Sequence, residues 1–150
     1  MSIVLEEAIV FLVAACVAAD EVLVGEEVIE LNEVAARIGV DGAQLMAKVK
    51  PLALEIAQLE DDELEGRLAK VLSSVPDYER LFFFEAAMRL ILADNLMFSR
   101  ECSLLVFIAE QLSIPMEVVL ARVSYEAAVR EDLAIDVEEV LDEFAADWRA

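Results

Sequence analysis

The sequence predicts an all-α fold, a bundle of seven to eight helices, from its composition and from a segment that it uses twice. Only 4 Gly and 3 Pro occur in 150 residues, too few for a loop-rich β protein, and apolar residues make up 59%. That share exceeds the usual figure of about 45–50%. We therefore expect a single helical domain over residues 1–150, with either a large core or apolar surface left over for a partner.

An acidic motif that begins at Ala19 recurs at Ala93, 74 positions later. In each copy an Ala-Asp pair ends a nearly all-apolar stretch, and a Glu seven residues after the Asp opens an amphipathic one. Few positions are identical, so the prediction rests on the shared order of apolar helix, acidic turn and amphipathic helix. We expect two repeat halves, about 8–45 and 82–119, that pack about an internal pseudo-twofold axis.

The first half of the chain predicts three helices. The first runs from about 2 to 20 and is apolar on every face over its last two-thirds, which places it at the centre of the bundle. The second spans about 26–38, and Gly39 is expected to end it while Asp41 caps the next helix. In that third helix the apolar positions stay in helical phase across Pro51, which either kinks one helix or starts a second one in the same direction.

The second half begins with the acidic run 60–63, which favours the amino terminus of a fourth helix through the macrodipole. Asp77 is expected to cap a fifth helix that is as apolar as the first, and Arg89 within it would need an acidic partner if it is buried. A sixth helix is predicted at about 99–112, and a seventh begins at Pro115.

A last helix is predicted from Asp136, because Asp136 and Glu139 form a capping-box pattern. Its apolar residues recur at helical spacing: Val137, Val140, Leu141, Phe144 and Trp148. The acidic residues between them form a solvated face or a surface that binds a basic partner.

The net charge of −20 argues against nucleic acid as a partner, because its phosphates would be repelled. The longest uninterrupted apolar run, from Ala8 to Ala19, is shorter than the roughly 20 residues that cross a bilayer, so we expect no direct membrane insertion. Cys16 and Cys102 lie in apolar helical runs and are predicted to be reduced core residues, which favours a cytoplasmic location.

The residue types that most enzymes need are missing, and we expect no catalytic activity. The chain has no His, which excludes His-based triads and Glu-x-x-His di-iron bundles. It also has no Gly-rich phosphate loop and no Cys-x-x-Cys pair. A carboxylate-only hydrolytic metal site remains the one enzymatic alternative.

The two acidic turns place four carboxylates at candidate helix ends: Asp20, Glu27, Asp94 and Glu101. If the halves pack about a twofold axis, these carboxylates could converge and suit a hard divalent cation such as Ca²⁺, Mg²⁺ or Mn²⁺. Alternatively, the two Glu residues stabilise helix amino termini, by about 0.3–1 kcal/mol each, and the two Asp residues bond turn amides. Both interpretations stay open.

The pattern Ala-Asp-x-x-apolar-x-x-x-Glu, used twice in a helical chain of this length, resembles the TerB-like proteins of tellurite resistance. The resemblance covers about Ala8 to Val123. It implies a small, all-helical, cytoplasmic protein of a stress or metal-resistance system. It also implies a cation site at the four acidic positions, with Leu23 and Met97 plugging the core.

The neighbours of those core residues have less reason to be buried: Val22, Val24, Leu96 and Phe98. Exposed apolar residues at two related turns would mark an interface, although they could also tuck into the bundle. We therefore predict a non-enzymatic interaction module that binds a protein partner or a second copy of itself, with a divalent cation as an optional modulator. The alternative is a stress protein whose function is ion binding itself.

Overall fold

The computed structural model describes residues 3–20, 25–91 and 99–129, and within these ranges the chain consists of helices joined by short turns. The helix that was predicted from Asp136 lies outside the described residues. The all-α class is therefore confirmed, with seven helices and no strand in the described ranges. The helices are α1 (Ile3–Asp20), α2 (Gly25–Ile38), α3 (Gly42–Ile56), α4 (Asp61–Leu72), α5 (Asp77–Ile91), α6 (Ser99–Gln111) and α7 (Met116–Val129).

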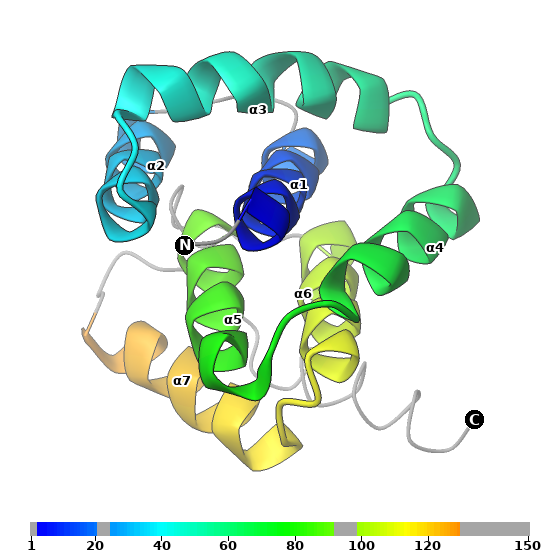
Figure 1. Cartoon of the computed structure of the whole chain (residues 1–150). Helices are drawn as coiled ribbons and strands as arrows, with labels where there is room; N and C mark the ends of the chain where they lie inside the picture. Colours follow the sequence, from blue (N-terminus) through cyan, green and yellow to red (C-terminus); the bar gives the residue numbers. More distant parts are fainter. Residues whose placement is uncertain (1–2, 21–24, 92–98, 130–150) are drawn as a thin grey trace.

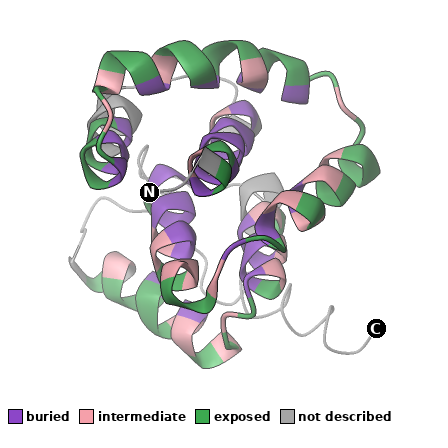
Figure 2. Ribbon diagram, viewed as in Figure 1, coloured by how far each residue is buried: buried purple, intermediate pink, exposed green. Residues whose placement is uncertain are grey.

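Helix α1 lies at the centre of the bundle, as its all-round apolar character predicts. It packs against α3, α4, α5 and α6. In Figure 1, α3 crosses one side of the group formed by α1, α5 and α6, and α7 crosses the opposite side. Residues 8–16 of α1 are all buried, and Figure 2 shows the contrast with the largely exposed outer faces of α3, α4 and α7.

Helix α5 is the second central element. Phe83 and Phe84 are fully buried, and the Phe83 ring meets the Phe82 ring edge-on with 5.9 Å between centroids. Arg89 is exposed rather than buried, and its guanidinium lies 3.7 Å from a carboxylate oxygen of Glu33 on α2. The residue that interrupts the apolar helix therefore points out of the core, where its charge stays hydrated.

Pro51 does not start a second helix, because α3 runs unbroken from Gly42 to Ile56 with Pro51 inside it. Asp41 is its N-cap, as predicted, and the Asp41 backbone N–H donates to Oε1 of Gln44 at 3.4 Å. Pro51 is exposed. The hydrogen bond that proline removes is offset by apolar side chains buried on the inner face: Leu45, Val49, Ala53 and Ile56.

Gly39 ends α2 as predicted, in the left-handed region with φ of 79°. Its N–H donates to the carbonyl of Ala36, and the Val40 N–H donates to the carbonyl of Ala35 at 3.0 Å. These two bonds form a Schellman motif, which satisfies carbonyls that the end of the helix would otherwise leave unpaired.

Ser113 ends α6 in the same way, with φ of 56°. Its N–H donates to the carbonyl of Glu110, and the Ile114 N–H donates to the carbonyl of Ala109 at 2.9 Å. Gly39 and Ser113 are 74 positions apart, which is the spacing of the acidic motif. Because this position holds a serine and not a glycine, the sequence does not predict the left-handed end of α6.

The helices that follow these two ends, α3 and α7, begin at Gly42 and Met116, which are also 74 positions apart. Helix α4 has no counterpart and connects the two sets. Asp77 differs slightly from its prediction, since it is the first residue of α5 rather than the cap before it. Pro76 takes the preceding position, and its carbonyl accepts a bond from the Glu79 N–H at 3.0 Å.

Candidate functional site

Three of the four predicted acids lie in described helices: Asp20 in α1, Glu27 in α2 and Glu101 in α6. Each is close to a segment outside the described residues, 21–24 or 92–98. Asp94 falls within 92–98, outside the described residues. The side chains of all four acids also lie outside the part of the chain that the structure describes, so their convergence stays a prediction.

The predicted interface residues Val22, Val24, Leu96 and Phe98 belong to the two turn segments 21–24 and 92–98. Both segments lie outside the described residues. Their role as an interface stays a prediction for the same reason.

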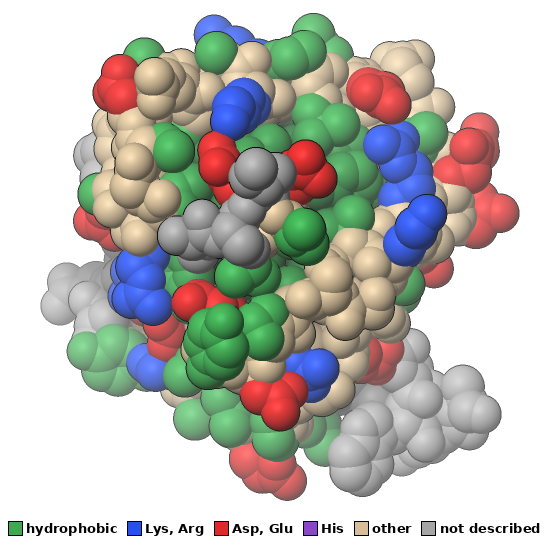
Figure 3. Space-filling view, in the orientation of Figure 1, with side chains coloured by type: hydrophobic (Ala, Val, Ile, Leu, Met, Phe, Trp, Pro, Cys, Tyr) green, Lys and Arg blue, Asp and Glu red, His purple; other side chains and the backbone are tan. Residues whose placement is uncertain are grey.

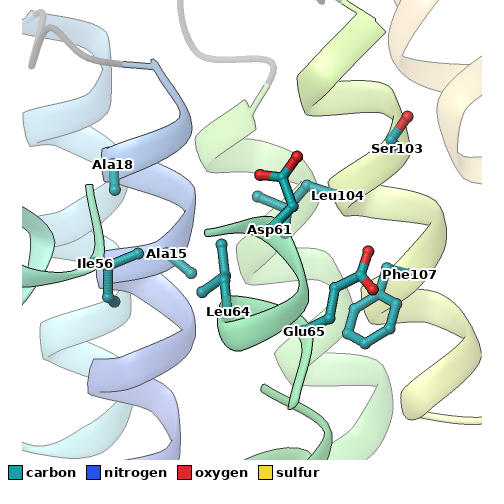
Figure 4. A pocket seen from close by; sticks show the side chains of 9 residues that line it. All are labelled: Ala15, Ala18, Ile56, Asp61, Leu64, Glu65, Ser103, Leu104 and Phe107. Atoms are coloured by element: carbon teal, nitrogen blue, oxygen red, sulfur yellow. The ribbon is translucent and has the colours of Figure 1, made fainter. Parts of the chain in front are cut away.

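A small pocket lies close to these helix ends, between α1, α3, α4 and α6, with a volume of about 100 Å³. Ala18 contributes from α1, two residues before Asp20, and Ser103 contributes from α6, two residues after Glu101. The backbone of both candidate positions is therefore near the pocket. Figure 4 shows the lining side chains: Ala15, Ala18, Ile56, Asp61, Leu64, Glu65, Ser103, Leu104 and Phe107.

Helix α4 supplies the two carboxylates of this pocket, Asp61 and Glu65. They stand four residues apart on one helix face, and Figure 4 shows both on the side of α4 that borders the pocket. Both residues are exposed, and the pocket lining contains no Lys or Arg. The pocket therefore combines an acidic mouth with an apolar wall that includes Phe107, which favours a cation or a basic side chain over an anion.

Sequence reasoning treated the run 60–63 as a solvated helix start and did not find this pocket. The start of α4 is confirmed at Asp61. The available signal was the spacing of Asp61 and Glu65, but two acids at this spacing also occur on any solvated helix face. Only the packing of α4 against α1 and α6 gives the pair a place near the acidic turns.

The remaining chemistry of the described residues is sparse. Among residues whose side chains are described, no group of three or more His, Cys, Asp and Glu could hold a metal ion. Cys16 is buried and forms no disulfide, as predicted for a core cysteine, whereas the Cys102 side chain is outside the described set. None of the helices in the described ranges has the length and apolar character to cross a membrane.

Comparisons with models of protein families, with curated proteins and with solved structures find no match to this chain.

Proposed function

We propose that this chain is a non-enzymatic protein-interaction module of a stress or metal-resistance system, of the TerB-like kind and located in the cytoplasm. One observation carries the proposal. The left-handed helix ends at Gly39 and Ser113 lie 74 positions apart, and the next helices begin at Gly42 and Met116 with the same spacing, which also relates the two acidic motifs. Agreement between the helix boundaries and the motif supports a duplicated architecture with a pseudo-twofold axis, in which the two acidic turns are equivalent.

The contacts between helices support the same arrangement. Helix α1 packs against α5 and α6, and α5 packs against α1 and α2. Each central helix therefore contacts the other and also the second helix of the opposite half. In a pseudo-twofold bundle of this kind, the α1–α2 and α5–α6 turns form one composite surface that carries the apolar residues Val22, Val24, Leu96 and Phe98.

The interaction is tested with Phe98→Asp, which puts a charge into that surface. We expect the wild-type chain to self-associate in sedimentation equilibrium, or, if it is a monomer, to capture a stoichiometric protein partner. The variant should lose either interaction. Tyr125→Asp is the matched control, because Tyr125 is 60% exposed on α7 and lies away from both turns in the sequence. Equal binding by wild type and Phe98→Asp would contradict the proposal.

A second candidate function, divalent cation binding at the acidic turns, is favoured by the position of the pocket between α1, α3, α4 and α6. Helix ends that carry Asp20 and Glu101 approach a mouth that already holds Asp61 and Glu65. Oxygen-only carboxylate sites suit Ca²⁺, Mg²⁺ or Mn²⁺. Ion binding would then be either the function itself or a modulator of the interaction. A dependence of stability on the cation would separate cation binding from a role of the four acids in helix-end electrostatics alone.

A further inference from the structure

An apolar groove lies between the carboxyl-terminal half of α1 and helix α3, and we call it the α1–α3 groove. Its volume is about 440 Å³, within the range of about 300–1,000 Å³ that is common for small-molecule sites. Val17 lines it from α1, and Val49 and Leu54 line it from α3. Val49 is buried, whereas Leu54 is 72% exposed, so apolar surface of the groove faces solvent in the folded chain.

Every residue that lines the α1–α3 groove is apolar except Lys50. The Lys50 side chain is exposed, and it has no ion-pair partner among the described residues. The other two charged residues of α3 are already paired, Lys48 with Glu6 at 2.7 Å and Glu55 with Arg67 at 3.2 Å. Lys50 therefore places an uncompensated positive charge at the rim of an apolar surface.

The lining contains no acid, which distinguishes the α1–α3 groove from three other hollows in the described part of the chain. Asp and Glu outnumber Lys and Arg by 31 to 11, and Figure 3 shows Asp and Glu side chains bordering apolar surface on one face. Of these four hollows, the α1–α3 groove is the one where a negative charge on a ligand meets no acid in the lining. The other three contain two acids each: Asp61 and Glu65, Glu6 and Glu7, and Glu33 and Glu85.

Lys50 also argues against a second copy of the chain as the occupant of the groove. It lies midway between Met46 and Leu54 in the α3 wall. In a symmetric antiparallel pair of α3 helices, the middle of each wall lies opposite its own copy. Two lysines would then meet within an apolar contact, and like charges placed in this way are strongly unfavourable. A separate ligand that carries a negative charge fits the lining better.

The dimensions of the groove suit an alkyl chain of medium length. Helix α3 rises about 10 Å between Lys50 and Ala57, at about 1.5 Å per residue, and the lining residues of this stretch are apolar. An alkyl chain laid along it removes its own surface and that of Leu54 from water, which is favourable in proportion to the area buried. A carboxylate at the end of the chain accepts a charge-assisted hydrogen bond from the Lys50 ammonium group.

We propose that the α1–α3 groove binds a medium-chain fatty acid, with its alkyl chain against Val17, Val49 and Leu54 and its carboxylate at Lys50. A cationic amphiphile is disfavoured because the lining contains no acid, and a ligand with several negative charges finds only one base. The inference concerns a site separate from the two acidic turns, and it does not rest on the proposed interaction with a protein partner.

Titration of the ¹⁵N-labelled full-length chain with decanoate tests the proposal, and decanol serves as the uncharged ligand of equal chain length. We expect saturable changes in the ¹H–¹⁵N spectrum, confined to residues of α1 and α3 at the groove. Lys50→Gln should weaken decanoate binding about fivefold, the upper range for an exposed ion pair, and leave decanol binding unchanged. Leu54→Glu should abolish decanoate binding, because it puts a carboxylate beside the ligand. Both side chains are exposed, so the fold should persist, which far-ultraviolet circular dichroism verifies.

Two matched controls make the same changes at exposed residues of other helices, Lys70→Gln on α4 and Tyr125→Glu on α7. Both should bind decanoate as the wild type does.

Three outcomes would overturn the proposal. If the wild type shows no saturable change at the groove, the groove does not hold an alkyl chain. If the wild type, Lys50→Gln and Leu54→Glu bind decanoate equally, the ligand binds elsewhere. If sedimentation shows a wild-type dimer that Leu54→Glu dissociates, this face is an interface between copies of the chain.

Discussion

Gly39 and Ser113 occupy equivalent left-handed positions, with φ of 79° and 56°, but only one of them is a glycine. An L-residue in this region has an unfavourable contact between its Cβ and the carbonyl oxygen, at a cost of roughly 1–2 kcal/mol. A Cβ at Gly39 would meet no atom within 4 Å. The effect of a substitution there is therefore conformational rather than steric.

Exchanging glycine and serine at these two positions should change the free energy of unfolding in opposite directions. Gly39→Ser should lower the free energy of unfolding by about 1 kcal/mol, and Ser113→Gly should raise it by a similar amount. Urea denaturation measures both. Ser73→Gly is the control, because Ser73 has φ of −62° and gains nothing from glycine. Stabilisation by Ser73→Gly equal to that by Ser113→Gly would contradict the explanation.

At the scale of single residues, the sequence located one helix end and missed the other. Gly39 is a strong stop signal because glycine reaches positive φ freely. Ser113 gives no such signal. Its conformation is held by its own N–H bond to the Glu110 carbonyl and by the Ile114 N–H bond to the Ala109 carbonyl, and Pro115 discourages continuation of α6. The pairing of Arg89 with Glu33 joins residues far apart in the sequence, so no local pattern could predict it.

Helix α1 is buried on every face over residues 8–16, and α5 has a run of buried side chains over 83–91 that only Glu85 and Arg89 interrupt. These buried stretches contribute stability through packing against the neighbouring helices. Phe84 illustrates this, because it is 0% exposed. Truncation should leave a cavity among side chains that cannot collapse to fill it.

We expect Phe84→Ala to lower the free energy of unfolding by about 3–5 kcal/mol. Tyr78→Ala on the same helix should change it by less than about 0.5 kcal/mol, since Tyr78 is 79% exposed. Thermal or chemical denaturation of both variants tests the difference. Similar losses for the two would mean that the face of α5 towards the core is assigned wrongly.

Helix boundaries were predictable at the scale of elements because caps and apolar periodicity are local. The predicted start at Asp41 and end at Gly39 needed only neighbouring residues. The groove that Val10, Leu52 and Val71 line between α1, α3 and α4 could not be predicted in this way, because it depends on how α3 and α4 pack against α1, which is a tertiary property.

For the whole molecule, charge distribution is the main link between fold and function. The net charge is −20, yet ion pairs connect different helices: Lys48 with Glu6, Arg67 with Glu55, Arg89 with Glu33, and Arg122 with Glu85. These exposed pairs contribute little stability individually. Their effect is to hold four of the few basic residues in ion pairs within the bundle, which leaves the excess acids to attract cations or basic partners.

The candidate site was predictable only in part. Sequence spacing predicts Asp20, Glu27 and Glu101 at helix ends, and the structure describes their backbone within α1, α2 and α6. Whether their carboxylates meet depends on the conformation of two turns and on how the halves pack. Neither follows from residue spacing, because a short connection between two helices permits many turn geometries.

The most direct test of the acidic turns is unfolding after chelator treatment and again with Ca²⁺, Mg²⁺ or Mn²⁺ present. The wild type is compared with Asp20→Asn/Asp94→Asn and with the charge-matched control Glu63→Gln/Glu117→Gln, whose residues are exposed in the first turns of α4 and α7. A site in the native state should add about 2.7 kcal/mol of stability when the cation is at a hundredfold excess over its dissociation constant.

We expect this cation-dependent stabilisation in the wild type and in the control, and its loss in Asp20→Asn/Asp94→Asn. That result would establish the acidic turns as a cation site that conditions the interaction surface. Equal stabilisation of all three proteins would instead reflect general screening of the −20 charge. It would contradict the cation site and leave the four acids as helix-end electrostatics.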